Sequence, residues 1–196
     1  DLHNSPHSFP TRRSSELAAA IERAGEEANV LYGSYPPGGA ATEAGAFLAA
    51  YREHFGECGL EESIAEALAS APRLAEPFAA LLRGADAPAA NALTKDSLQT
   101  AFVLAARALA AERPTIILID DLHFAPEEGL SLFTALALGV PGHRLLLIGA
   151  ARPELPEPWT AALLRSESAS LLALSRLGGA EVAALVADAL RSERLA

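Results

Sequence analysis

The chain is poor in the residues that mark several classes of protein. Cys58 is the only cysteine among 196 residues, so no disulfide can form within the chain and a reducing compartment is expected. The five histidines do not show the spacing of a zinc site, and we assign no function to Cys58, His54 or His143. No run approaches the roughly 18 to 20 apolar residues of a membrane span. The N-terminus lacks the basic start and apolar run of a signal peptide. These features favour a cytoplasmic protein that does not engage a membrane.

Basic residues are scarce as well. The chain has 15 Lys and Arg against 25 Asp and Glu, which gives a net charge of −10. We interpret the acidic excess as solvated helix surface that keeps the protein in solution. Because no basic stripe stands out, direct nucleic-acid binding by this segment is not expected. Aromatic residues make up 6% of the chain while apolar residues make up 51%, with much alanine. That composition favours a helix-rich fold with a real core, of one domain to a domain and a half.

The first fifteen residues do not look like part of the fold. They are polar, contain two prolines and show neither helix nor strand periodicity, as in a disordered tail. Residues 7–15, HSFPTRRSS, also resemble one reading frame of a common sequencing-library adapter, and the match ends at Glu16. We therefore interpret residues 1–15 as an adapter artefact or a tail and leave them out of fold reasoning. The rest of the chain then reads as the inside of a longer protein.

Apolar periodicity after residue 15 predicts helices that alternate with strands. Thr94 is the expected N-cap of the strongest helix, and Pro114 ends it. The continuous apolar runs TIILID and RLLLIGA are typical of buried parallel strands. The predicted helices are 16–27, 41–55, 60–70, 74–83, 94–111, 126–138 and 179–194, and the predicted strands are 29–35, 115–120, 144–150 and, as a candidate, 171–174. This order predicts an α/β fold, a parallel sheet with helices on both sides and a helical insertion at about 41–111.

The most informative residues are the acid pair Asp120 and Asp121 at the end of TIILID. An acid next to a buried strand needs water, hydrogen bonds or a cation to offset the cost of its burial. Ligands of open α/β sheets bind beyond the carboxyl ends of the parallel strands. The pair therefore indicates either a ligand and cation site or a simple cap of the following turn, and the two acids alone do not separate these alternatives.

The surroundings of the acid pair resemble the STAND branch of AAA-like P-loop ATPases. In that family a strand ends in Asp-Asp-Leu-His-Trp-Ala, a helix follows, and the next strand ends in Gly-Thr-(Ala/Tyr)-Arg-Pro-Glu. This chain has DDLHFAPEE from residue 120 and IGAARPE from residue 148, with Phe124 for the usual Trp and Ala150 for the usual Thr. The resemblance spans residues 16 to 196. It implies a P-loop NTPase-type sheet with ATP and Mg²⁺ as ligands.

The resemblance also implies a role for single residues. Asp120 matches the acid that helps to hold Mg²⁺, and Asp121 matches the acid that polarises the attacking water. Arg152 matches the sensor-1 arginine that reads the γ-phosphate, a task that suits a planar and permanently charged guanidinium. The alternative for Arg152 is a surface salt bridge. His123 either touches nucleotide or a partner or is a structural residue, and we favour the structural role.

The phosphate-binding loop of this family is absent from the chain. The pattern G-x-x-x-x-G-K-[ST] does not occur, and the PPGG sequence at 36–39 has neither the lysine nor a following helix at the right spacing. In the family this loop leads into a helix and a strand, which residues 16–27 and 29–35 match. We therefore expect a partial ATPase domain over 16–178 without its Walker A loop, followed over 179–196 by the start of a further helical segment.

Two longer stretches resemble a bacterial subgroup of the family. They are YPPGGAATEAGAFLAAYREHFG, from Tyr35, and LTKDSLQTAFVLAARALAAERPTIILIDDLHFAPEEG, from Leu93. Proteins of the subgroup join a Ser/Thr protein kinase, this ATPase and tetratricopeptide repeats, so neighbouring domains and protein partners are implied by the resemblance alone. The expected function is an ATP-binding, slowly hydrolysing signalling switch. The alternatives are a non-catalytic interaction scaffold and an origin-recognition-like AAA+ protein, which the acidic charge disfavours.

Overall fold

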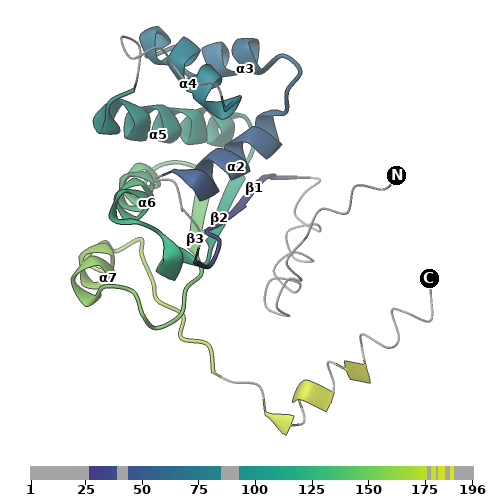
Figure 1. The fold of residues 1–196 in the computed structure, drawn as a ribbon, viewed down its shortest axis with the longest axis vertical. Helices are drawn as coiled ribbons and strands as arrows, with labels where there is room; N and C mark the ends of the chain where they lie inside the picture. Colours follow the sequence, from purple (N-terminus) through teal and green to yellow (C-terminus); the bar gives the residue numbers. More distant parts are fainter. Residues whose placement is uncertain are drawn as a thin grey trace. The chain divides into compact units, whose positions relative to one another are not determined.

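The structure is a computed structural model that describes residues 27–38, 44–84, 93–175, 178–179, 181–183 and 186–187. Residues Asp1–Leu163 form one compact unit and Leu164–Ala196 form a second. The elements of the first unit are β1 (Asn29–Ser34), α2 (Gly45–Phe55), α3 (Leu60–Ala67), the 3₁₀ turn η1 (Pro72–Leu74), α4 (Ala75–Leu82), α5 (Lys95–Glu112), β2 (Thr115–Asp120), the 3₁₀ turn η3 (Leu122–Phe124), α6 (Glu127–Gly139), β3 (Leu145–Gly149) and α7 (Glu157–Leu163) (Figure 1).

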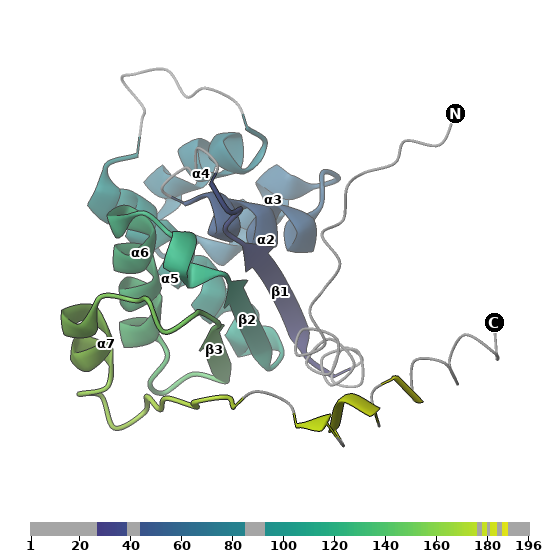
Figure 2. The same ribbon diagram turned by 60° about the horizontal axis from the view of Figure 1, so that its bottom comes forward.

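The three strands form one open parallel sheet in the order β1, β2, β3 (Figure 2). Asn29 pairs with Thr115, and Ser34 pairs with Asp120 at the other end of the same ladder. On the far side of β2, Thr115 pairs with Leu145. All three strands therefore point the same way and end at one edge. The predicted α/β fold class and parallel sheet are confirmed.

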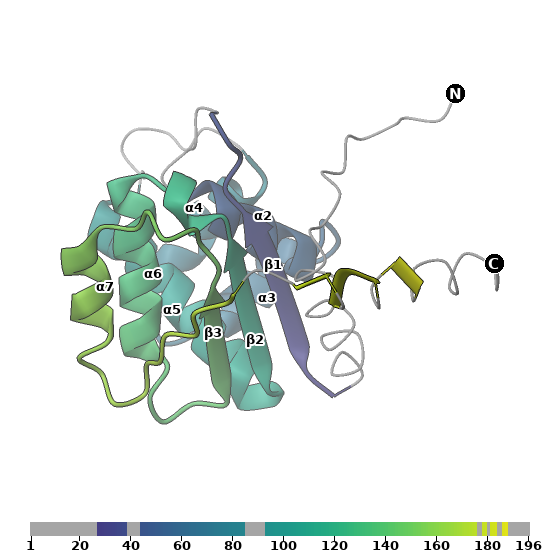
Figure 3. The same ribbon diagram turned by 90° about the horizontal axis from the view of Figure 1, so that it is seen from below.

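The helices that contact the sheet in the described part of the chain lie on one of its faces. Helix α2 packs against β1 so closely that a Cβ on Gly33 would lie 1.9 Å from the Ala46 carbonyl oxygen. On β3, a Cβ on Gly149 would lie 2.8 Å from Phe133 of α6, and Gly149 and Gly33 both flank Ile119. Successive right-handed crossovers in one direction across a sheet place their helices on the same face. Figure 3 shows the three strands in front, with α2 behind β1 and α6 beside β3.

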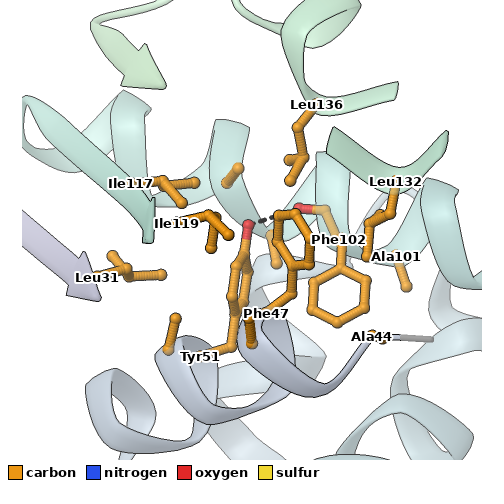
Figure 4. Packing of buried hydrophobic residues seen from close by; sticks show 14 of the residues in the cluster. Leu31, Ala44, Phe47, Tyr51, Ala101, Phe102, Ile117, Ile119, Leu132 and Leu136 are labelled. Carbon is orange, nitrogen blue, oxygen red and sulfur yellow. Dashed lines mark hydrogen bonds between the residues drawn. The ribbon is translucent and has the colours of Figure 1, made fainter. Parts of the chain in front are cut away.

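Within the predicted insertion at 41–111, α2 and α5 pack on the sheet, and α3 and α4 form a second helical layer on this face. Helices α3 and α4 pack against each other and on α2 and α5 (Figure 1). Its centre is an aromatic cluster in which Phe102 stacks edge-to-face on Tyr51 at 4.9 Å and on Phe78 at 5.0 Å. The buried Tyr51 hydroxyl donates to the Phe102 carbonyl oxygen at 3.0 Å (Figure 4). This bond satisfies a polar atom that burial would otherwise penalise.

Most element boundaries follow the predictions within a few residues. The turns η1 and η3 and the helix α7 were not predicted, and residues 171–175 form no strand, so the candidate strand at 171–174 is wrong. Leu171 and Leu172 are 69% and 80% exposed there, and no neighbouring strand satisfies their backbone. Pro126 is the N-cap of α6 rather than a residue of its first turn. The predicted helix 16–27 lies almost wholly outside the described residues. Of the predicted helix 179–194, the residues described (179, 181–183 and 186–187) are helical.

Candidate functional site

The sequence-predicted site residues lie at the carboxyl edge of the sheet. Asp120 is the last residue of the central strand β2, and Asp121 follows it directly. Arg152 comes three residues after the end of the neighbouring strand β3. Two backbone bonds join the two exits, from the Ala150 amide to the Ile119 carbonyl oxygen at 2.9 Å and from the Leu122 amide to the Ala150 carbonyl oxygen at 3.0 Å. The segments that carry the acids and the arginine are therefore held side by side.

Asp120 accepts hydrogen bonds from the residue after β1 and from the acid that follows it in the sequence. Its carboxylate Oδ1 accepts from the Asp121 amide at 2.8 Å, and its carbonyl oxygen accepts from the Tyr35 amide at 3.2 Å. The side chain is half-buried. One carboxylate oxygen thus holds the turn, and the side chain also interacts with Tyr32 of β1. A carboxylate is a hard oxygen donor, the type that Mg²⁺ prefers.

Asp121 has an unusual backbone. Its φ of 55° and ψ of 35° place it in the left-handed region, and it is the one non-glycine residue with positive φ in the described part of the chain. Asp and Asn adopt this conformation at lower cost than other residues with a side chain. The Ser34 hydroxyl donates to its Oδ2 at 3.5 Å, and its side chain is 40% exposed. The bend therefore turns the second carboxylate away from the sheet, with part of it open to solvent.

His123 is buried, and one of its ring nitrogens has no partner. Its side chain is 2% exposed, and the ring stacks on Phe124 with centroids 4.0 Å apart. Nδ1 accepts from the Arg152 amide at 3.5 Å and lies 3.9 Å from Asp121 Oδ1. Within the described residues Nε2 is buried without a hydrogen-bond partner. The His123 side chain is therefore buried, and an unpaired buried nitrogen costs about 1–3 kcal/mol unless something binds it.

The side chain of Tyr32 completes the edge and was not predicted. Tyr32 lies on β1, two residues before Ser34, and partial burial together with the charge of Asp120 raises the pKa of its phenol. Burial is the larger cause, and the carboxylate charge of Asp120 adds to it. A polar residue at the end of a predicted strand next to an acid-bearing strand is the signal that points to Ser34. Tyr32 carries no such signal, because its side chain position depends on the register of β1 against β2.

A donor set of this kind fits Mg²⁺ rather than a metal with an all-protein site. Mg²⁺ is commonly held by one or two carboxylates, with water and phosphate oxygens completing its shell. No group of three or more His, Cys, Asp or Glu that could hold a metal occurs in the part of the chain that the structure describes. Asp120 and Asp121 provide the carboxylates of the smaller kind of site.

A groove lies elsewhere in the first unit. It has a volume of about 760 Å³ and is lined mainly by α6 and α7, with Trp159 on one side. Trp159 Nε1 donates to Thr134 Oγ1 at 2.9 Å and to the Leu130 carbonyl oxygen at 3.1 Å, so the wall of the groove is fixed. Neither acid nor Arg152 is among the lining residues.

Comparison of the chain with models of protein families, with curated proteins and with solved structures gave no match. No helix in the described residues is long and apolar enough to cross a membrane.

Proposed function

We propose that this chain is the Walker B and sensor-1 part of an ATP-binding signalling switch of the STAND, AAA-like P-loop type, acting in the cytoplasm. The single observation that supports the proposal most is the joint placement of Asp120, Asp121 and Arg152 at the carboxyl edge of adjacent parallel strands. That edge is where open α/β sheets bind ligands. Two acids and a guanidinium suit a ligand that carries both a cation and phosphate groups.

Each residue has a separate task in this proposal. Asp120 binds the cation side through its carboxylate, whose Oδ1 also accepts from the Asp121 amide. Asp121 accepts a hydrogen bond from the attacking water and orients it, since its carboxylate is partly exposed and the Ser34 hydroxyl fixes one oxygen. Mg²⁺, when bound with ATP, neutralises charge on the β- and γ-phosphates.

Arg152 and His123 form the opposite side of the site. The Arg152 amide donates to His123, which ties the start of the arginine segment to the segment after the acid pair. The exposed Arg152 guanidinium then reaches the γ-phosphate and distinguishes ATP from ADP. In the proposed switch this contrast between ATP and ADP is transmitted to other domains or protein partners.

Arg152→Ala in a longer chain of this protein, one that carries a phosphate-binding loop before residue 16, tests the proposal. We expect ATP affinity to fall about tenfold or more while ADP affinity changes little, because only ATP has the γ-phosphate. Arg73→Ala is the matched control, since Arg73 is exposed on η1, away from the strand ends. Calorimetric titration with both nucleotides measures the two affinities. Equal losses for ATP and ADP, or none, contradict the assignment of Arg152.

A further inference from the structure

One face of the sheet is apolar and carries no helix from the described residues. We call it the open face, and it consists of the side chains opposite to α2 and α6. Tyr32 on β1 is 43% exposed and Leu146 on β3 is 53% exposed, values that are unusual for a parallel sheet. Parallel sheets occur almost only with both faces covered. The alternation of the strands assigns to the open face Val30, Tyr32, Ile116, Leu118, Leu146 and Ile148.

The other face has no space for another helix over β1. Leu31 is 1% exposed there, and α2 touches the backbone of Gly33. A helix that enters β1 directly from the N-terminal side must lie on one of the two faces, because αβ connections are short. Since α2 occupies one face at β1, only the open face remains for such a helix.

The segment immediately before β1 has the pattern of a helix with one apolar side. Residues 16–26 lie outside the described residues, and their sequence, ELAAAIERAGE, places Leu17, Ile21 and Ala24 at helical spacing. Two residues, Glu27 and Ala28, separate this segment from Asn29. Eleven helical residues would span about 16 Å, which matches the roughly 16–20 Å of strands five or six residues long.

We propose that residues 16–26 dock as a helix on the open face, with Ile21 against the central strand β2. The occupant is thus a segment of this chain, and the apolar face is an internal interface rather than a surface for a partner. The inference is independent of the proposed nucleotide site. Competing occupants are the C-terminal segment from 176 onward and a second copy of the chain, and both are separate outcomes of the test.

Thiol labelling of the full 196-residue chain tests the docking. In a Cys58→Ser background, the labelling rate of Ile116→Cys measures how accessible the centre of the open face is. Leu138→Cys, at a position 73% exposed on α6, gives the labelling rate of an accessible thiol. Ile21→Asp places a charge in the proposed interface. Ala19→Asp is the matched control, because two residues turn a helix by about 200° and place the new charge on the opposite side.

We expect Ile21→Asp to raise the labelling rate of Ile116→Cys about tenfold. Ala19→Asp should leave the labelling rate of Ile116→Cys within twofold of the parent value, and neither variant should change the labelling rate of Leu138→Cys by more than twofold. An Ile116→Cys rate that neither variant changes, or that both change equally, overturns the proposal. A rate that depends on protein concentration identifies a second copy as the cover, and a rate raised only by removal of residues 176–196 identifies the C-terminal segment. Both results overturn the proposal too.

A cross-link keeps the proposal testable if Ile21→Asp fails to fold. We expect Ile21→Cys to cross-link to Ile116→Cys with a bis-maleimide that spans about one helix diameter, roughly 10 Å. The control pair is Ile21→Cys with Glu53→Cys, because Glu53 is exposed on α2, on the other side of the sheet. Efficient linkage of the first pair and none of the second supports the docking, and absence of the first link refutes it.

Discussion

Gly33→Ala should damage the fold severely, because β1 and α2 meet at this glycine backbone to backbone. The new Cβ would lie 1.9 Å from the Ala46 carbonyl oxygen, where ordinary contacts begin at 3.4 Å. Relief therefore needs a shift of α2 by about 1.5 Å, which the buried Phe47 and Tyr51 oppose. A shift of this size would separate side chains that now touch, and a gap of about 0.5–1 Å already removes a quarter to a half of the dispersion energy of a contact. Overpacking in general costs about 1–3 kcal/mol.

From these terms we expect a loss of at least about 3 kcal/mol of unfolding free energy, or roughly 10 °C in Tm. Gly139→Ala is the matched control, because its Cβ would approach side chains and no backbone: Val103 at 3.0 Å, which can move, and Arg107 at 3.8 Å. Thermal unfolding followed by circular dichroism measures both variants. A Gly33→Ala protein that melts within about 2 °C of the parent refutes the close packing of α2 on β1.

Three further outcomes are expected. Thr94→Ala should cost about 1 kcal/mol because the Thr94 side chain accepts from the Ser97 amide, and Thr100→Ala, whose hydroxyl bonds within the helix to the Asp96 carbonyl oxygen, should cost less in the same urea titration. Burial lowers the pKa of His54, while the charge of Glu112 opposes this shift. The unfolded chain therefore binds the proton more readily than the folded one, and stability should fall as pH drops below about 6.5. Thermal melts between pH 8 and pH 5 test this, and a His54→Gln protein whose stability depends on pH as strongly as that of the parent would contradict it. The 196-residue chain, whose sequence holds no Walker A pattern, should bind Mg-ATP weakly or not at all, and micromolar affinity in calorimetry would refute that.

The elements with a regular apolar pattern in the sequence were predictable. Continuous apolar runs gave β2 and β3, and the Thr94 cap with the long apolar period gave α5. Parallel strands then had to end at a common edge, so the placement of the segments after β2 and β3 at that edge followed from topology. Short elements without such a period were not predictable. The turn η3 depends on the left-handed Asp121, and α7 is held by the contact of Trp159 with Phe133.

Tertiary contacts decided what the sequence left open. Gly33 looks like any glycine in a strand, and only the proximity of Ala46 shows that no side chain fits there. The segment LLAL at 171–174 has the composition of a strand, but a strand needs a neighbouring strand to satisfy its backbone. Residues 171–175 pair with no strand in the described part of the chain. The burial of His123 likewise depends on Phe124 and on the Arg152 segment, which lies 29 residues away along the chain.

The central claim is that the acid pair serves ATP hydrolysis, with a different task for each acid. The direct test is single-turnover hydrolysis by a longer chain with a phosphate-binding loop, comparing Asp121→Asn with Asp120→Asn. Asparagine suits both positions, because it tolerates the left-handed backbone of Asp121 and still accepts from Ser34.

We expect Asp121→Asn to keep Mg-ATP affinity and slow hydrolysis by about 10² to 10⁴-fold, and Asp120→Asn to weaken Mg²⁺-dependent binding as well. Hydrolysis by Asp121→Asn at the parent rate would contradict the account. The acid pair would then be a cap and a structural anchor, and a non-catalytic scaffold would be the better description of the protein.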